Sequence, residues 1–216
     1  MLNTLKTRFV NIEEERVIEK AGSHGLNVGS TSDFRKFGYN YDCIEEVMDD
    51  YCRSFTRYYA LSGLTTGIGG FATSVSFAGL DSITLAVQLY QLAQRFAILN
   101  GFDDSDPLQK GTILNIYFGT LGINAGIKAT LKHHLLQADA LADEGKASES
   151  LLLKVIIRAG ESFGGKINSA EARRLIPVIG GLDGAAINYI LARQAGTKMK
   201  KDFKRAYFKT WQGEEI

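Results

Sequence analysis

The sequence predicts an all-α fold: a single multi-helix bundle with Gly-rich central helices and a basic amphipathic C-terminal helix. Three observations lead to this prediction. The chain of 216 residues contains only two prolines, apolar residues recur at helical spacing over long stretches, and Gly, Ser, Asn and Asp cluster between those stretches. Charged residues at 23% and apolar residues at 45% are ordinary for a globular protein of this size, which is large enough to bury a core.

We expect an N-terminal helical extension over residues 1–57 and a helical domain over residues 58–216, packed together as one unit. In the extension, Asn11 and Glu14 have the spacing of a capping box and predict a helix that ends near Gly22. Asp42 and Glu45 repeat that spacing and predict the start of a second helix.

The second helix leads into a stretch from Tyr58 to Leu80 that contains no charged residue. A stretch of this length without charge must be buried in a protein core or in lipid. Its glycines, serines and threonines make it too weakly apolar for a stable membrane span. We predict a closely packed central helix, and Asp81 is expected to begin the next helix as its N-cap.

Later in the chain, Asp106 followed by Pro107 predicts the start of another helix, because proline at the first helical position loses no hydrogen bond. Pairs of glycines four residues apart remove side chains from one helix face, so that two backbones can approach closely. On this basis we predict close helix packing at Gly63, Gly67, Gly122, Gly126, Gly180 and Gly184.

Several kinds of chemistry are not expected from this sequence. The net charge of +1 excludes a strong overall field, and Cys43 and Cys52 are spaced as reduced thiols of a cytosolic protein. Residues 160–166 have the spacing of a P-loop, but Ile167 follows where a magnesium-binding hydroxyl is required. No catalytic residue, metal site or cofactor is predicted, and we favour a protein that is not an enzyme.

Three polar residues fall close to one face of an otherwise apolar helix, namely Asp81, Gln88 and Gln91. Buried side chains of this kind need hydrogen-bond partners. They form a candidate ligand-binding site. The alternative is an N-cap at Asp81 with a hydrogen-bonded pair of glutamines in the core.

The C-terminal segment combines an apolar stripe with a high density of positive charge. Met199, Phe203, Tyr207 and Trp211 recur at four-residue spacing. The basic residues around them include Lys200, Lys201, Lys204 and Arg205. This pattern is typical of a helix that lies in a membrane interface, so these eight residues are the candidate membrane-binding set. The alternative is a final helix whose stripe packs on the bundle.

Three blocks of the chain resemble the EcsC family. They are GLTTGIGGF with the apolar helix after it, the loop GFDDSDP, and the long run RLIPVIGGLDGAAINYILARQAGTKMKKDFKRAYF. Together they cover roughly Tyr58 to Phe208. The matching positions are Gly67, Gly70, Asp81, Asp103, Asp106, Pro107, Arg174, Pro177, Gly180, Gly184 and Asn188. The resemblance implies a mostly helical, cytosolic protein of bacteria or bacteriophages and brings no catalytic motif with it.

We therefore expect a non-enzymatic protein that associates peripherally with the inner face of a membrane, or that binds a lipid or another apolar ligand between its helices. One alternative is a soluble regulatory module that binds a membrane transporter or another protein. A second is an enzyme acting on lipids with a polar site near Asp81. Nucleic acid binding is not expected, because the rest of the chain offers no basic surface that extends the charge of the tail.

Overall fold

A computed structural model describes residues 12–67, 71–123, 125–126, 129, 154–161 and 184–214 of the chain. The long elements are α-helices: α2 (Glu14–Ser23), α3 (Tyr41–Gly67), α4 (Phe71–Leu99), α5 (Pro107–Thr120) and α9 (Gly184–Tyr207). Two short 3₁₀-helices, η1 (Thr31–Lys36) and η2 (Gly38–Asn40), connect α2 to α3. A π-helical segment, η3 (Phe208–Gln212), extends α9. Across this part of the chain there is no strand, and the predicted all-α fold is confirmed.

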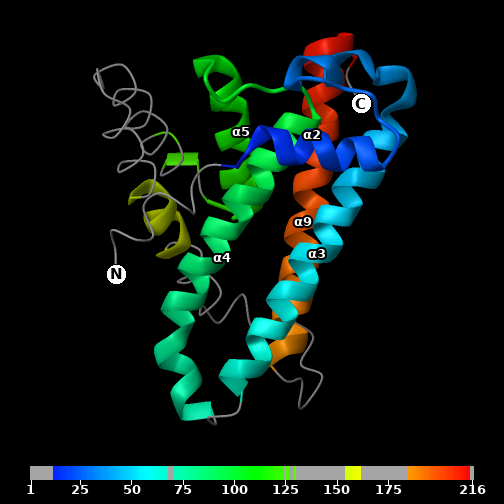
Figure 1. The fold of residues 1–216 in the computed structure, drawn as a ribbon. Helices are drawn as coiled ribbons and strands as arrows, with labels where there is room; N and C mark the ends of the chain where they lie inside the picture. Colours follow the sequence, from blue (N-terminus) through cyan, green and yellow to red (C-terminus); the bar gives the residue numbers. More distant parts are fainter. Residues whose placement is uncertain are drawn as a thin grey trace.

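The long helices α3 and α9 lie side by side, and α4 packs against both of them (Figure 1). Helix α5 contacts α4 and α9, while α2 crosses α3 and α4 at one end of the bundle. The predicted boundary after residue 57 falls inside α3, which continues to Gly67 without a break. Helix α2 contacts α3 and α4, and η1 contacts α4.

The uncharged stretch from Tyr58 to Leu80 contains the end of α3 and the beginning of α4, so the prediction of one central helix is wrong. Asp81 lies inside α4, ten residues after its start at Phe71, and does not act as an N-cap. Gly79 also lies inside α4 and does not interrupt it. One interior glycine costs a helix only about 1 kcal/mol relative to alanine, which does not end a helix of this length.

Three helices end in the same way, with a glycine in the left-handed backbone conformation. Gly25, Gly101 and Gly122 have φ values of 83°, 74° and 64° and follow α2, α4 and α5. After α4, the Phe102 N–H donates to the carbonyl of Ala97 at 2.9 Å, which is the long hydrogen bond of a Schellman motif. Gly122 is exposed and follows the end of α5, and the close helix packing predicted for it stays a prediction. Gly126 is exposed as well.

The structure agrees with the predicted start of α5 but not with the capping roles predicted for Asp42 and Glu14. The Asp106 carboxylate accepts from the N–H groups of Leu108 and Gln109, and Pro107 is the first residue of α5, as predicted. Asp42 is not a cap, since α3 already begins at Tyr41. The capping role predicted for Glu14 is also wrong, because its carboxylate accepts from the backbone N–H and the hydroxyl of Thr31 instead.

Helices α3 and α9 approach each other closely at Gly196, a glycine that the spacing rule did not select. A Cβ atom at this position would lie 3.0 Å from the Sγ atom of Cys52 on α3. Gly180 lies outside the described residues, and so do the surroundings of Gly63, Gly67 and Gly184. The packing role predicted for these four glycines stays a prediction.

The core near the C-terminus is built from aromatic rings around the end of α4. Phe203 packs edge-on against Phe96 with ring centroids 6.0 Å apart, and Phe102 lies 5.4 Å from the Trp211 ring. The Tyr207 hydroxyl lies within hydrogen-bonding distance of the backbone carbonyls of Phe34 and Arg35, at 2.9 and 3.0 Å. The C-terminal segment is thereby joined to η1, near the other end of the chain.

Substituting Gly101 tests this end of α4, and Gly25 provides a matched control. Both have positive φ, but a Cβ on Gly101 would lie 2.5 Å from Cγ of Arg35, whereas nothing lies within 4 Å of one on Gly25. We expect Gly25→Ala to cost about 1–2 kcal/mol of unfolding free energy from backbone strain alone. Gly101→Ala should cost at least about 3 kcal/mol because steric overlap is added to the strain. Urea denaturation measures both, and equal costs would contradict the proposed contact.

Candidate functional site

The apolar stripe of the C-terminal segment is buried inside the bundle. Met199, Phe203 and Tyr207 have no exposed surface, and Trp211 is half-buried. The Trp211 indole N–H donates to the backbone carbonyl of Asn100 at 2.8 Å, and the Arg35 guanidinium stacks 4.3 Å from the indole ring. In this fold the stripe predicted to meet lipid packs against protein.

Two of the basic residues in the predicted membrane-binding set are paired with acids on α3. The Lys200 ammonium lies 2.7 Å from Asp49 and 3.1 Å from Glu45, and the Lys204 ammonium lies 2.6 Å from Glu45. Burial opposes ionisation of Glu45, but the hydrogen bonds from the two lysines outweigh it and lower the pKa of this carboxyl. Arg205 lies 3.5 Å from Asp202 on its own helix, and Lys201 is exposed.

Further along the seam between α3 and α9, the ion pairs give way to an open groove of about 370 Å³. Its cationic and aromatic lining consists of Arg53, Arg57, Arg193 and Tyr189, which we call the arginine groove. The other lining residues are Asp49, Cys52, Thr56 and Thr197. Burial raises the pKa of the Cys52 thiol to about 12, so this thiol is not a reactive nucleophile.

The arginine groove carries an excess of positive charge. Asp49 is engaged by Lys200, and Arg53 is paired with Asp50. Arg57 and Arg193 are exposed, and within the described part of the chain neither has a carboxylate partner. Two guanidinium groups are therefore available to an anion, and guanidinium suits phosphate because it donates two parallel hydrogen bonds.

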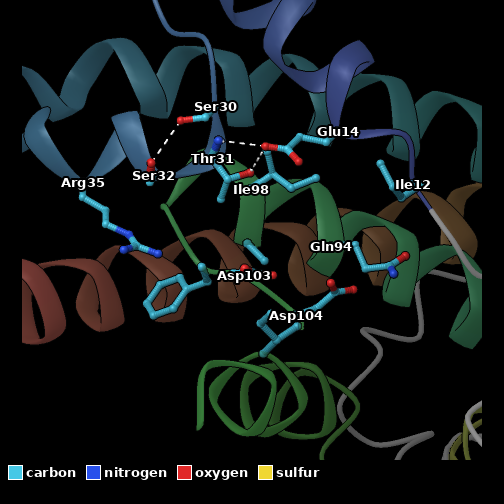
Figure 2. A pocket seen from close by; sticks show the side chains of 13 residues that line it. Ile12, Glu14, Ser30, Thr31, Ser32, Arg35, Gln94, Ile98, Asp103 and Asp104 are labelled. Atoms are coloured by element: carbon cyan, nitrogen blue, oxygen red, sulfur yellow. Dashed lines mark hydrogen bonds between the residues drawn. The ribbon is translucent and has the colours of Figure 1, made fainter. Parts of the chain in front are cut away.

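A second cavity of about 340 Å³ lies between α2, η1, α4 and the loop that leads into α5 (Figure 2). Its polar lining includes Glu14, Thr31, Arg35, Gln94, Asp103 and Asp104. Its apolar lining is Ile12, Ala97, Ile98, Phe102 and Ile113. We call this cavity the Gln94 pocket.

Gln94 is the polar residue of this pocket whose hydrogen bonding is incomplete. The residue is only 6% exposed, and its Oε1 atom has no hydrogen-bond partner among the described residues. Burial raises the pKa of the neighbouring Asp104 carboxyl, while a hydrogen bond from the Gln94 side chain acts in the opposite direction. Figure 2 shows the polar ends of these two side chains on the same side of the pocket.

The polar residues predicted from the sequence do not form this site. Gln88 and Gln91 are half-buried on α4, and neither lines the Gln94 pocket. The side chain of Asp81 lies outside the described residues. Gln94 was not among the residues predicted from the sequence, although it follows Gln91 by three residues and is a neutral polar residue in an apolar helix, the signal that selected Gln88 and Gln91.

Two further observations concern metal binding and membrane crossing. Among the described residues, no three His, Cys, Asp or Glu side chains lie close enough to hold a metal ion. None of the helices in the described ranges combines the length and the apolar character that crossing a membrane requires.

Searches of protein-family models, of curated proteins and of solved structures return no match to this chain. The resemblance to the EcsC family therefore stays a prediction, and the functional argument depends on the geometry of the molecule itself.

Removing the charge of Glu45 tests how much the ion pairs between α3 and α9 stabilise the fold. Because the folded state lowers the pKa of Glu45, its stabilising effect is complete above the ordinary value of 4.5 and is lost as pH falls through the lowered pKa. We expect Glu45→Gln to cost about 1–2 kcal/mol at neutral pH. The difference from wild type should vanish in acid.

Thermal or urea unfolding between neutral pH and pH values below the lowered pKa measures this difference. Glu46→Gln removes an exposed carboxylate from the next position and is the control. It should change stability by no more than about 0.5 kcal/mol. A cost for Glu45→Gln that is independent of pH would show that the charge of Glu45 does not hold the seam together.

Proposed function

We propose that this protein is a non-enzymatic, peripheral membrane-binding protein that docks on anionic lipid through the arginine groove. The proposal depends on one observation: charged residues stop at matching positions along α3 and α9. Arg57 is the last charged residue before the uncharged stretch 58–80, and Arg193 is the first after the uncharged residues 184–192. Both arginines line one groove, so the charged surface ends at the same level on α3 and α9.

Two exposed tyrosines lie beside these arginines. Tyr58 is 58% exposed next to Arg57, and Tyr189 is 42% exposed in the groove itself. Tyrosine and arginine together are typical of membrane interfaces, since the ring enters the apolar boundary while the phenol or guanidinium contacts headgroups. This supports an orientation in which the uncharged end of the bundle faces lipid and the arginines bind phosphate.

Burial of the C-terminal stripe favours one competing candidate, a regulatory module that binds a membrane transporter or another protein. That alternative expects the stripe to pack inside the bundle, as it does. It assigns no role in lipid binding to Arg57 and Arg193, so vesicle binding separates the two candidates.

Vesicle binding by wild type and by the double variant Arg57→Gln/Arg193→Gln tests the proposal. Each basic residue near an anionic surface contributes about 1 kcal/mol, so losing two should weaken binding to phosphatidylglycerol vesicles about 30-fold. Wild-type binding should also fall as salt increases, and vesicles of phosphatidylcholine alone should bind little protein.

The matched control is Arg16→Gln/Lys36→Gln. It removes two exposed cations from α2 and η1, and neither residue lines the arginine groove. It should leave vesicle binding within about twofold of wild type, because these charges lie outside the docking surface. Equal losses in both double variants would mean that overall charge is responsible, and absence of wild-type binding would reject the proposal in favour of a protein partner.

A further inference from the structure

The Gln94 pocket contains an unmet hydrogen-bonding requirement that packing alone does not explain. Buried polar atoms are nearly always hydrogen-bonded, and leaving one unpaired costs about as much as the desolvation of that group. The Oε1 atom of Gln94 is buried without a partner, although the other side of the amide is engaged by Asp104. Because a carboxylate accepts hydrogen bonds, the amide directs its N–H₂ toward Asp104 and leaves its carbonyl oxygen available. The missing group is therefore a hydrogen-bond donor.

The charges around the pocket favour a donor that is a cation. Three carboxylates line it, those of Glu14, Asp103 and Asp104, against the single guanidinium of Arg35. That guanidinium is already engaged, since its Nε donates to the Gly101 carbonyl at 2.8 Å and its plane stacks on Trp211. Lys110 lies outside the lining but also acts on Asp104 and lowers the pKa of its carboxyl. Among the lining residues carboxylates still outnumber cations three to one, which favours a cationic ligand over an anionic one.

The carboxylates differ in how much of their bonding capacity is already used. Glu14 accepts two hydrogen bonds from Thr31, at 2.8 and 2.6 Å, and Asp103 accepts two from Ser105. These contacts hold the wall of the pocket in place. Asp104 is the carboxylate beside Gln94, and the polar ends of the two side chains lie on the same side of the pocket (Figure 2).

We propose that the Gln94 pocket binds a small primary ammonium compound with a short hydrocarbon body, whose N–H groups donate to Gln94 Oε1 and to the Asp104 carboxylate. The apolar lining, including Ile98, Phe102 and Ile113, provides a surface for the hydrocarbon part. A volume of about 340 Å³ lies at the lower end of the range for small-molecule sites. This inference goes beyond the proposed membrane binding and does not depend on it.

Thermal unfolding and titration calorimetry with n-butylamine at neutral pH test the proposal. We expect a saturable rise in melting temperature, of about 5–10 °C when the free amine reaches one hundred times its dissociation constant. Tetramethylammonium carries the same charge without an N–H donor, and n-butanol has a donor without the charge. Neither should produce a saturable shift. A flat response to n-butylamine would mean that water fills the pocket and would overturn the proposal, as would an equal shift with tetramethylammonium.

Gln94→Met separates the binding role of this side chain from a structural one. Methionine keeps an unbranched chain of similar length and removes the unpaired oxygen. The substitution also removes the N–H₂ group that donates to Asp104, so the gain and the loss offset each other and the ligand-free variant should melt within about 3 °C of wild type. Its affinity for n-butylamine should fall at least tenfold. Unchanged affinity would overturn the proposal.

A second pair of variants keeps the test valid if Gln94→Met does not fold. Asp104→Asn should weaken n-butylamine binding about tenfold, since a charge-assisted hydrogen bond becomes a neutral one. Glu46→Gln removes a carboxylate that does not line the pocket and should leave the affinity unchanged. Equal losses in both variants would point to non-specific attraction of the amine and would count against the site. Vesicle binding by Gln94→Met should match wild type, so failure here is distinguishable from failure of the membrane proposal.

Discussion

The buried amide of Asn100 joins three parts of the molecule that are far apart in the sequence. Its Oδ1 accepts from the Tyr41 hydroxyl at the start of α3, and its Nδ2 donates to the Phe96 carbonyl within α4. Its backbone carbonyl accepts from Trp211 in η3. The residue has no exposed surface, so each lost bond would leave a buried polar group unpaired at a cost of about 1–3 kcal/mol. The relative positions of α3, α4 and the C-terminal segment are thereby fixed together.

The position of α9 along α3 follows from this junction. Once Tyr207 and Trp211 are fixed at one end, the four-residue stripe faces the core, and Lys200 and Lys204 meet Glu45 and Asp49. Acidic partners for α9 are confined to this end of the seam. Toward the N-terminus of α9 the cations have no counterpart among the described residues, which leaves Arg57 and Arg193 exposed in the arginine groove. The same alignment that stabilises one end of the seam creates the charged site at the other.

A feature of the fold could be predicted from the sequence where the residues that determine it lie close together in the chain. Asp106 and Pro107 mark the start of α5 by chemistry contained within one helical turn, and the structure agrees with that prediction. Met199, Phe203 and Tyr207 were correctly recognised as one helical face, but spacing does not specify what covers that face. Core and lipid select the same apolar pattern, so only the tertiary structure distinguishes them. Asp81 was misassigned because a capping signal inside a longer apolar pattern yields to the continuing helix. Asp42 was misassigned because α3 begins one residue before it, at Tyr41.

The contrast between Asn100 and Gln94 could not be read from the sequence, since both are neutral amides in one largely apolar segment, Gln94 within α4 and Asn100 directly after its end. Asn100 is fully paired, as expected of a polar residue kept for structure. Gln94 is nearly as deeply buried and yet leaves an acceptor without a partner among the described residues, beside a carboxyl whose ionisation is disfavoured by burial. Two adjacent destabilising features are hard to reconcile with a purely structural role, because an apolar side chain would fill the same space at lower cost. A donor that carries positive charge offsets both at once, since it satisfies the amide oxygen and stabilises the ionised Asp104. The instability of the empty pocket and the chemistry of its proposed ligand thus have the same origin.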